Sequence, residues 1–438
     1  MYNGYVITIK NLRPHPNADR LQIATVFNED VIVDLSYKEG DKCIYFPSDG
    51  QLGPEFCEVN NLVRKKDEAG NNIGGYLDPN KRNVKAIKLR GSFSDGLLLP
   101  INSLSTFTDV DKLVEGQPIS ELNGIIICTK YIPKTNKVHR YQQQTKTNKK
   151  EAKEKISYPY FLEHKDTQQL RFCTDKFREG DLCTLTLKMH GTSARTSNSI
   201  EVIKKKRNWI LRNVFKQNPT VMKNWKVISG TRRVVLRNNN FVDGWYGDNE
   251  FRKKYHEALA DKLPKGMTIY YEIVGYINET TPIMATCNNS KISDPEFKKQ
   301  YGEETIFHYG CSVGDNDSYV YRITMQNEDG VAIELSWSDV KIWCEKLGLK
   351  SVPEFETFFF TTVEDLWERV YKYYDGPDPI GQTHIREGVV VRIENRETFT
   401  AYKHKNDHFK ILEGIMKENA DAPDIEEAQE ELITFVEV

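Results

Sequence analysis

The stretch KMHGTSAR, Lys188 to Arg195, is the segment on which the interpretation of this chain depends. The alternating run LCTLTLKMH, Leu182 to His190, predicts a strand that ends near Lys188. Small and polar residues follow and predict a turn, where Gly191 allows a ligand to approach the backbone closely. A lysine amine is a nucleophile only when it is deprotonated, which nearby positive charge or burial favours. The KxxG pattern is short, so this stretch alone also fits a surface lysine before a turn.

Two glutamates lie further along the chain, each at a strand-like segment. Glu272 lies within YYEIVGY, on an apolar strand predicted from Met267 to Ile277. Glu387 lies in REGVVVRI, just before a strand predicted from Gly388 to Ile393. Glu272 alone also fits a structural carboxylate with a buried partner.

Two lysines lie on the next predicted strand, Phe399 to Lys405. Residues two apart on a strand face the same side, so Lys403 and Lys405 present two cations on one face, and Tyr402 and His404 lie on the other. Two adjacent like charges are unfavourable unless an anion lies between them. A triphosphate would provide that anion.

Together these motifs resemble the covalent nucleotidyltransferases, the family of polynucleotide ligases and messenger-RNA capping enzymes. That family has a KxxG lysine, an acidic residue on a later strand, an aromatic strand, an EG-containing strand and a final KxK strand. This chain has the same elements in the same order: Lys188 to Gly191, Glu272, YVYRI around Tyr321, Glu387-Gly388, and Lys403 to Lys405. Five motifs in order are much more specific than one.

The sequences of two motifs resemble those of RNA ligases more than those of DNA ligases. These are KMHGTSAR and SGTRRVVL, Ser229 to Leu236, and DNA ligases usually carry Asp where His190 stands. DNA ligases and capping enzymes also carry an OB domain after the KxK strand. Only 33 residues follow Lys405 (438 − 405), which is too few for such a barrel. The resemblance is closest to RNA ligases with an OB module before the catalytic domain.

The amino-terminal region carries its own resemblance. Short alternating strands and turns fill residues 1–104 and predict a small barrel or sandwich. HPNADRLQIATV, His15 to Val26, and RGSFSDGLLLP, Arg90 to Pro100, resemble OB-fold tRNA-binding modules of aminoacyl-tRNA synthetases. The alternative is that Pro16 to Asp19 form only a turn before a strand.

We therefore expect an α+β protein: an OB-like β-barrel followed by a ligase-type adenylyltransferase domain with antiparallel sheets and flanking helices. The expected division is 1–104 for the OB fold, 105–155 for a connecting segment with a charged linker, and 156–438 for the nucleotidyltransferase domain with an acidic tail. Helices are predicted from Ser338 and from Thr362.

The resemblance implies an ATP-dependent RNA ligase with three steps. Lys188 attacks the α-phosphate of ATP and forms lysyl-AMP. AMP then moves to an RNA 5′-phosphate, and a 3′-hydroxyl attacks the activated end and releases AMP. Lys403 and Lys405 would hold the α-phosphate and help to keep Lys188 neutral.

The resemblance also implies roles for the remaining site residues. Glu272 would accept hydrogen bonds from the ribose, and Glu387 would place Mg or Mn through water. Tyr321 would stack on adenine, with Tyr319 as the rival because both face the same side. Arg195 and Arg232 would contact ribose or phosphate, and Arg233 is the alternative to Arg232. His190 would act in a later step. The tyrosines also fit a hydrophobic core, and the arginines also fit a surface role.

The charge of the chain is unevenly distributed along the sequence. The net charge is −2, but residues 414–438 hold eight acids and one base, a net of −7, so the remainder carries −2 − (−7) = +5. We expect RNA with 5′-phosphate and 3′-hydroxyl ends as partner, with an RNA/DNA hybrid or structured RNA as further options. The basic run 203–216, with Trp209 and Phe215 among cations, fits either RNA contact or a solvated face.

The amino terminus does not resemble a secretory signal, and the longest apolar run is too short to cross a bilayer. The eight cysteines form no CxxC pair, so a zinc site or a disulfide framework is not expected. We expect a monomer in the cytoplasm, or in the host cytoplasm if the chain is viral. Two alternatives remain: a GTP-using capping enzyme, and an RNA-binding protein on an inactive ligase fold.

Overall fold

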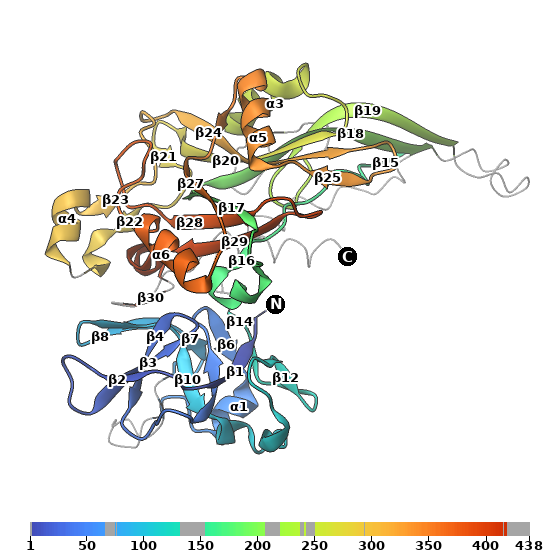
Figure 1. The fold of residues 1–438 in the computed structure, drawn as a ribbon. Coiled ribbons are helices and arrows are strands. Elements are labelled where there is room, and N and C mark those ends of the chain that lie inside the picture. Colours follow the sequence, from blue (N-terminus) through green and yellow to red (C-terminus); the bar gives the residue numbers. More distant parts are fainter. Residues whose placement is uncertain are drawn as a thin grey trace, which may run out of the picture. The chain divides into compact units, whose positions relative to one another are not determined.

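The structure is a computed structural model that describes residues 2–65, 75, 77–131, 154–205, 220–236, 241, 250–292, 294–414 and 416–417. The chain divides into two compact units (Figure 1). Unit 1 comprises residues 1–134, 288–300 and 410–438, and unit 2 comprises 135–287 and 301–409. Most of the predicted charged linker, the basic run from residue 206 and the acidic tail from residue 418 lie outside the described residues.

Unit 1 consists mainly of short antiparallel strands. Its central sheet has the order β10-β5-β1-β11, and three further three-stranded sheets have the orders β2-β3-β4, β14-β6-β7 and β30-β8-β9. The strands are β1 (Gly4–Thr8), β2 (Leu12–Pro14), β3 (Leu21–Val26), β4 (Glu29–Asp34), β5 (Lys42–Phe46), β6 (Gly50–Leu52), β7 (Asn83–Val84), β8 (Ala86–Leu89), β9 (Ser92–Ser94), β10 (Leu97–Pro100), β11 (Pro118–Ile119), β12 (Glu121–Leu122), β13 (Ile125–Ile126), β14 (Cys128–Lys130) and β30 (Met416–Lys417).

The core of unit 1 includes side chains that follow Leu104, the predicted carboxy-terminal end of the OB-fold domain. Val6, Ile44 and Phe46 from the central sheet pack with Phe56 on helix α1 (Pro54–Val59). The same cluster includes five residues after position 104: Phe107, Leu113, Ile119, Ile127 and Cys128. If the domain ended at Leu104, its core would lack these five side chains. We therefore propose that the OB-fold domain extends through β14.

Unit 2 contains an eight-stranded sheet with the order β15-β18-β20-β24-β25, to which β19, β21 and β26 add by pairing with β18, β20 and β24. Its strands are β15 (Glu154–Ser157), β18 (Thr192–Lys205), β19 (Thr220–Gly230), β20 (Met267–Asn278), β21 (Thr281–Pro282), β24 (Asn316–Gln326), β25 (Ala332–Glu334) and β26 (Lys350–Ser351). β20 is buried along most of its length because β18 and β24 flank it on either side.

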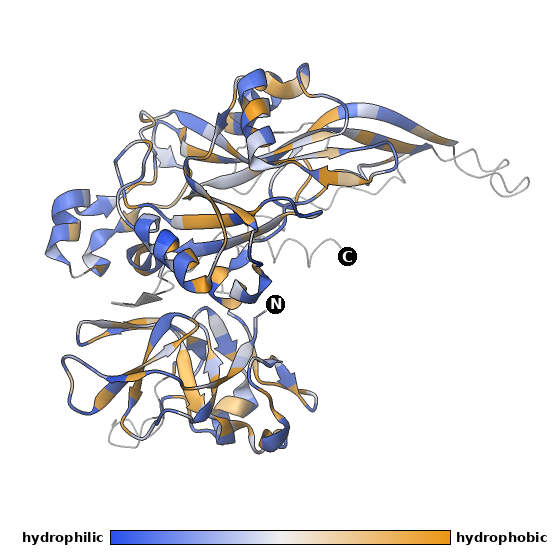
Figure 2. Ribbon diagram, viewed as in Figure 1, coloured by the Kyte–Doolittle hydropathy of each residue, from blue (hydrophilic) through white to orange (hydrophobic). Residues whose placement is uncertain are grey.

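The second sheet of unit 2 has five strands in the order β16-β29-β28-β17-β27. They are β16 (Gln168–Gln169), β17 (Leu182–Lys188), β27 (Glu354–Phe359), β28 (Gly388–Ile393) and β29 (Thr400–Lys405). β28 is hydrophobic over most of its length (Figure 2), as expected for a central strand. Four strand predictions, the ones on β17, β20, β28 and β29, are confirmed within two residues at each end, and the aromatic segment around Tyr321 lies on β24.

Two helices cover parts of these sheets, and both predicted helices are confirmed. α5 (Trp337–Leu347) begins at the Ser336 cap and ends at Gly348, whose φ of 70° only glycine adopts readily. α6 (Val363–Tyr373) begins at Thr362, which accepts a hydrogen bond from the Asp365 amide, and packs its apolar face against the five-stranded sheet. The remaining helices are α3 (Glu250–Ala260), α4 (Pro295–Tyr301), α7 (Asp407–Glu413) and short 3₁₀ turns.

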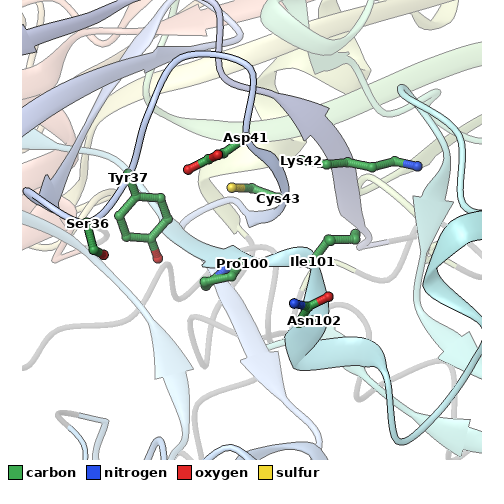
Figure 3. A pocket seen from close by; sticks show the side chains of 8 residues that line it. All are labelled: Ser36, Tyr37, Asp41, Lys42, Cys43, Pro100, Ile101 and Asn102. Atoms are coloured by element: carbon green, nitrogen blue, oxygen red, sulfur yellow. The ribbon is translucent and has the colours of Figure 1, made fainter.

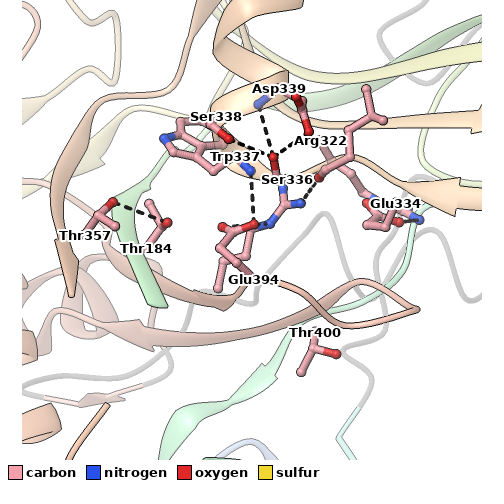
Figure 4. Close-up of polar contacts among 12 residues, drawn as sticks. Thr184, Arg322, Glu334, Ser336, Trp337, Ser338, Asp339, Thr357, Glu394 and Thr400 are labelled. Carbon is pink, nitrogen blue, oxygen red and sulfur yellow. Dashed lines mark hydrogen bonds and ion pairs between the residues drawn. The ribbon is translucent and has the colours of Figure 1, made fainter. Parts of the chain in front are cut away.

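A buried charge network links the two sheets of unit 2 (Figure 4). Arg322 on β24 donates to both carboxylate oxygens of Glu334, over 2.7 and 2.9 Å. Glu394, just after β28, accepts the Trp337 amide at 3.0 Å and lies 3.2 Å from the Arg392 guanidinium. Arg392 also donates to the Leu335 carbonyl, next to Glu334. Since a buried charge without its partner is strongly unfavourable, these contacts hold β24 and β25 to α5 and β28.

Substitution Phe56→Ala tests the core of unit 1. The ring is fully buried between Phe46 and Phe107, with centroid distances of 5.6 and 5.7 Å. We expect the free energy of the unfolding that exposes the β1 and β5 amides to fall by about 3–5 kcal/mol. Hydrogen exchange of these amides measures the change. The control Phe359→Ala, with its side chain 65% exposed in unit 2, should leave this protection unchanged. Equal protection in Phe56→Ala and the wild type would contradict the assigned core.

Candidate nucleotide-transfer site

Strand register brings three of the predicted residues together. Lys188 at the end of β17 pairs with Gly388 on β28, which pairs in turn with Lys405 on β29. The Glu387 carboxylate lies beside this row. Its Oε1 is 2.5 Å from Lys188 Nζ and 3.3 Å from Lys405 Nζ. The KxxG, EG and KxK motifs therefore converge on one point.

Glu387 is buried but remains charged. Its side chain is 2% exposed, and although burial disfavours the charge, Lys188, Lys405 and His190 hold its pKa below the ordinary value. Oε1 faces both lysines, whereas buried Oε2 has no hydrogen-bond partner among the described residues. His190 Nδ1 lies 3.9 Å from Oε2. Oε2 can therefore accept a hydrogen bond from a further donor.

The turn after Lys188 is held by aromatic residues. The His190 amide donates to the Tyr309 hydroxyl at 2.8 Å. The His190 ring makes edge contacts with Phe307 and Phe409, with centroid distances of 4.6 and 4.8 Å. A Cβ on Gly191 would lie 2.4 Å from the Ile273 carbonyl oxygen, so the glycine is required here for close packing against β20.

Glu272 faces the turn from β20. It pairs with Ser193 on β18, whose hydroxyl donates to Glu272 Oε2 at 3.1 Å. The pKa of Glu272 is raised to about 7, mainly by burial and in part by the charge of Glu387. Lys188 and Ser193 act in the opposite direction and lower it. A Cβ on Gly191 would lie 2.9 Å from Glu272 Cγ, so Glu272 packs against the turn that follows Lys188.

Tyr321 lies at a β-bulge on β24. Tyr270 and Tyr271 of β20 pair with Arg322 and Val320, which leaves Tyr321 as the extra residue. Its hydroxyl is 3.0 Å from His164 Nδ1, and the nearby Glu272 charge adds to burial in raising its pKa. Tyr319 is buried, and its hydroxyl donates instead to Asp317 at 3.3 Å. Strand register pairs Tyr319 with Glu272, whereas Tyr321 is the tyrosine whose pKa the Glu272 charge raises.

Arg232 also lies beside this group. It donates to Asp166 through Nε at 3.0 Å and through a second nitrogen, and its charge lowers the pKa of Glu272. Arg233 bonds the other oxygen of Asp166 at 3.1 Å. The electrostatic effect on Glu272 therefore favours Arg232 over Arg233.

Arg195 does not have the surroundings of a ligand-binding residue. Its guanidinium is 1% exposed and donates to the backbone oxygens of Thr231, Leu162 and Arg233, at 3.0, 2.5 and 3.2 Å. The guanidinium also stacks on the Phe161 ring at 4.3 Å. These contacts use the Arg195 donors to hold adjacent chain segments, so we propose a structural role for Arg195 in place of the predicted contact with ribose or phosphate.

The alternation on β29 agrees with the prediction. Tyr402 packs into the core under α6, and the His404 ring contacts Trp367 at 5.1 Å. Lys405 points to the opposite side, toward Glu387. Lys403 is half-buried, pairs with Val390 and lowers the pKa of His164.

Sequence reasoning missed His164, Tyr309 and the role of Ser193. Burial lowers the pKa of His164 to about 3, with Arg232 adding to the effect, so this imidazole is neutral. Strand alternation could have placed Ser193 beside Glu272, since both lie on paired strands. His164 and Tyr309 lie outside regular strands and helices, so no periodic pattern marks them.

A cavity of about 330 Å³ lies in unit 1 (Figure 3). Burial raises the pKa of its Cys43 thiol to about 12, which makes it a poor nucleophile. None of its lining residues belongs to the motifs above: Ser36, Tyr37, Asp41, Lys42, Cys43, Pro100, Ile101 and Asn102. The chemistry therefore belongs to the cluster around Lys188.

Substitution Arg195→Lys tests the structural role of this arginine. A lysine cannot reproduce the planar set of donors, so we expect the free energy of unfolding to fall by about 3 kcal/mol. Urea unfolding measures the change. The matched control Arg233→Lys, with its side chain 27% exposed, should cost less than about 1 kcal/mol. Wild-type stability in Arg195→Lys, with weakened nucleotide binding, would restore the ligand role.

The raised pKa of Glu272 predicts a pH dependence of stability. Folding takes up a proton between the ordinary value of 4.5 and the folded value of about 7, so this carboxyl lowers stability as pH rises through that window. Glu272→Gln has no carboxyl at this position, so it should not show this loss of stability. The lowered pKa of Glu387 changes stability only at pH values below this window. Urea unfolding at about pH 5 and about pH 8 should show the wild type losing stability relative to the variant. Parallel curves would show that the Glu272 pKa is not raised.

Comparison with known proteins agrees with this geometry. The RNA ligase family matches residues 182–412, and an OB-fold domain family matches residues 5–101. No curated protein matches the chain. Within the described residues, none of the helices is long and apolar enough to span a membrane.

Similar solved structures are forms of the RNA ligase of Naegleria gruberi. A mutant with ATP and Mn and a form with PPi each have a TM-score of 0.56, and a mutant with AMP and Mn has 0.55. Each is 16% identical and covers 93% of this chain and 97% of the other. At this identity the likeness shows the fold, and it confirms the prediction of an OB domain before a ligase domain. Because the family match covers more than half of the 438 residues, the chain belongs to the RNA ligase family.

Proposed function

We propose that the chain is an ATP-dependent RNA ligase that joins RNA 3′-hydroxyl and 5′-phosphate ends through lysyl-AMP on Lys188 and an RNA-adenylate. The observation that carries this proposal is the convergence of Lys188 and Lys405 on buried Glu387, with Glu272 packed against the turn that follows Lys188. A nucleophile, a phosphate-binding cation and a ribose-binding carboxylate are the groups that nucleotide transfer requires.

The nucleotide would be held between the two sheets of unit 2. The phosphates would contact Lys403 and Lys405 on the five-stranded sheet. The nucleoside would contact Glu272, Tyr321 and Arg232, which gather on and beside the eight-stranded sheet. The Naegleria ligase has been solved with ATP, AMP and PPi, which supports ATP as the nucleotide.

The first step forms a phosphorus–nitrogen bond. The Lys188 ammonium first gives one proton to water, and the lone pair of Nζ then attacks the α-phosphorus. The bond to the bridging oxygen breaks, and pyrophosphate leaves with that electron pair. The nitrogen then loses its extra proton to water. Negative charge builds on the phosphate oxygens, so Lys403 and Lys405 stabilise the transition state more than the ground state.

The later steps transfer the same adenylyl group. An oxygen of the RNA 5′-phosphate attacks the phosphorus of lysyl-AMP, and the phosphorus–nitrogen bond breaks. The 3′-hydroxyl then attacks the activated 5′-phosphate, loses its proton, and AMP leaves. His190, next to Glu387 and close to Lys188, is the side chain we assign to these later steps.

The residues present fit a hard divalent cation, Mg or Mn. Glu387 offers a charged carboxylate whose Oε2 has no hydrogen-bond partner among the described residues, which suits a metal-bound water. When bound, the cation supplies charge neutralisation on phosphate oxygens. The Mn in the Naegleria structures supports this assignment.

The finer substrate and location follow as proposals. RNA ends carrying 5′-phosphate and 3′-hydroxyl groups suit the adenylate chemistry. A reducing cytoplasm, or a host cytoplasm, is supported by the eight cysteines, all of which are unpaired thiols. We also propose that the chain acts as a monomer.

Labelling the protein with α-labelled ATP and magnesium tests the proposal. We expect acid-labile label on the denatured wild type and none on Lys188→Ala, because only Lys188 supplies the nucleophile. The control Lys372→Ala alters an exposed lysine on α6 and should label normally. Label from GTP alone would favour a capping enzyme. No label on folded wild type free of bound AMP would favour an inactive ligase fold that binds RNA.

A further inference from the structure

The β18–β19 hairpin extends past the strand that pairs with its base. β19 pairs with β18 from Arg195–Gly230 out to Lys205–Thr220, whereas β20 pairs with β18 only as far as Ser197. Figure 1 shows β18 and β19 side by side over this length, as an arm of unit 2. Beyond Ser197, β15 pairs with the same edge of β18 from Val202 to Lys205. The outer hairpin is therefore a three-stranded part of the sheet, and its exposed side chains include Lys204, Val221 and Lys223.

One face of the outer hairpin combines an indole with lysines. Cross-strand pairs Ile200–Trp225, Val202–Lys223 and Lys204–Val221 place these side chains on a common face. We call it the Trp225 face. The ammonium of Lys265, which precedes β20, lies 6.0 Å from the Trp225 ring centroid. Lys204, Lys223 and Lys265 are exposed, Trp225 is half-buried, and Val221 is 52% exposed.

The charges on the two faces differ. On the opposite face, Glu201 accepts hydrogen bonds from Lys226 at 2.9 Å and from Tyr158 at 3.0 Å, so positive charge is neutralised there. On the Trp225 face, the described positions of β18 and β19 include no acid: Thr192, Ala194, Thr196, Asn198, Ile200, Val202, Lys204, Val221, Lys223, Trp225, Val227 and Ser229. An excess of positive charge around an accessible aromatic ring attracts a polyanion.

We propose that the Trp225 face binds a single-stranded part of the RNA substrate. The lysines attract the phosphates, and the indole stacks on a base, which is how proteins hold single strands without reading sequence. This inference rests on the proposed RNA-ligase function. The Trp225 face lies on the other side of β18 from Ser193, which contacts Glu272, so it anchors RNA away from the ends that react.

RNA binding by the full chain tests the proposal, with fluorescence anisotropy of a labelled, unstructured RNA as the measurement. Trp225→Leu should weaken binding about tenfold, the effect of losing one stacked base. Lys204→Ala with Lys223→Ala should lower the slope of log affinity against log salt by about 1.4, since two phosphate contacts are lost. Both lysines are exposed, so this variant folds even if Trp225→Leu does not.

Two controls match these changes. Trp343→Leu alters another half-buried Trp beside a lysine, with Lys346 Nζ 4.8 Å from its ring, on α5. Lys205→Ala removes one positive charge from the opposite face of the hairpin, against two in the lysine variant. Both should bind RNA like the wild type, and all variants should become labelled by ATP at the wild-type rate.

The outcomes separate this inference from the proposed function. Wild-type affinity and salt slope in the lysine variant, or equal losses in the controls, would overturn the Trp225 face as an RNA site while labelling by ATP still supports the ligase. Absence of RNA binding by the wild type would overturn it as well. Loss of labelling in the wild type, with binding reduced only by changes on the Trp225 face, would instead count against the ligase function alone.

Discussion

The contact of Lys188 and Lys405 with the buried carboxylate of Glu387 is the interaction on which the site depends. Two cations near one anion leave the cluster with a net positive charge, which an incoming phosphate can neutralise. Removing the carboxylate would leave two neighbouring ammonium groups with less compensation, and such buried imbalances are strongly unfavourable. The same contact fixes the ends of β17, β28 and β29, so sheet geometry and phosphate binding are physically linked.

Much of this arrangement could be predicted because the motifs lie on strands. Strand alternation placed Lys403 and Lys405 opposite Tyr402 and His404, and the order of the motifs identified the ligase architecture. Pairing in the sheet then puts Lys188, Gly388 and Lys405 in one row. Helices α5 and α6 were predictable because Ser336, Gly348 and Thr362 occupy their capping positions.

The remaining features depend on contacts between segments far apart in the chain. Arg195 carries the same charge whether it meets a phosphate or the carbonyls of residues 161–162 and 231–233, and only the fold decides which. The β-bulge at Tyr321 has no glycine or proline to signal it. His164 acquires its place beside Tyr321 through a loop, and Phe107 to Cys128 join the OB core through short strands with little periodicity.

The central claim is that Lys188, held by Glu387, is the residue that carries AMP. Its most direct test is peptide mapping by mass spectrometry of the wild-type protein after incubation with ATP and magnesium and removal of free nucleotide. We expect one AMP on the peptide that contains Lys188, with fragment ions placing it on that side chain. AMP on Lys403, Lys405 or any other residue, with Lys188 unmodified, would contradict the account.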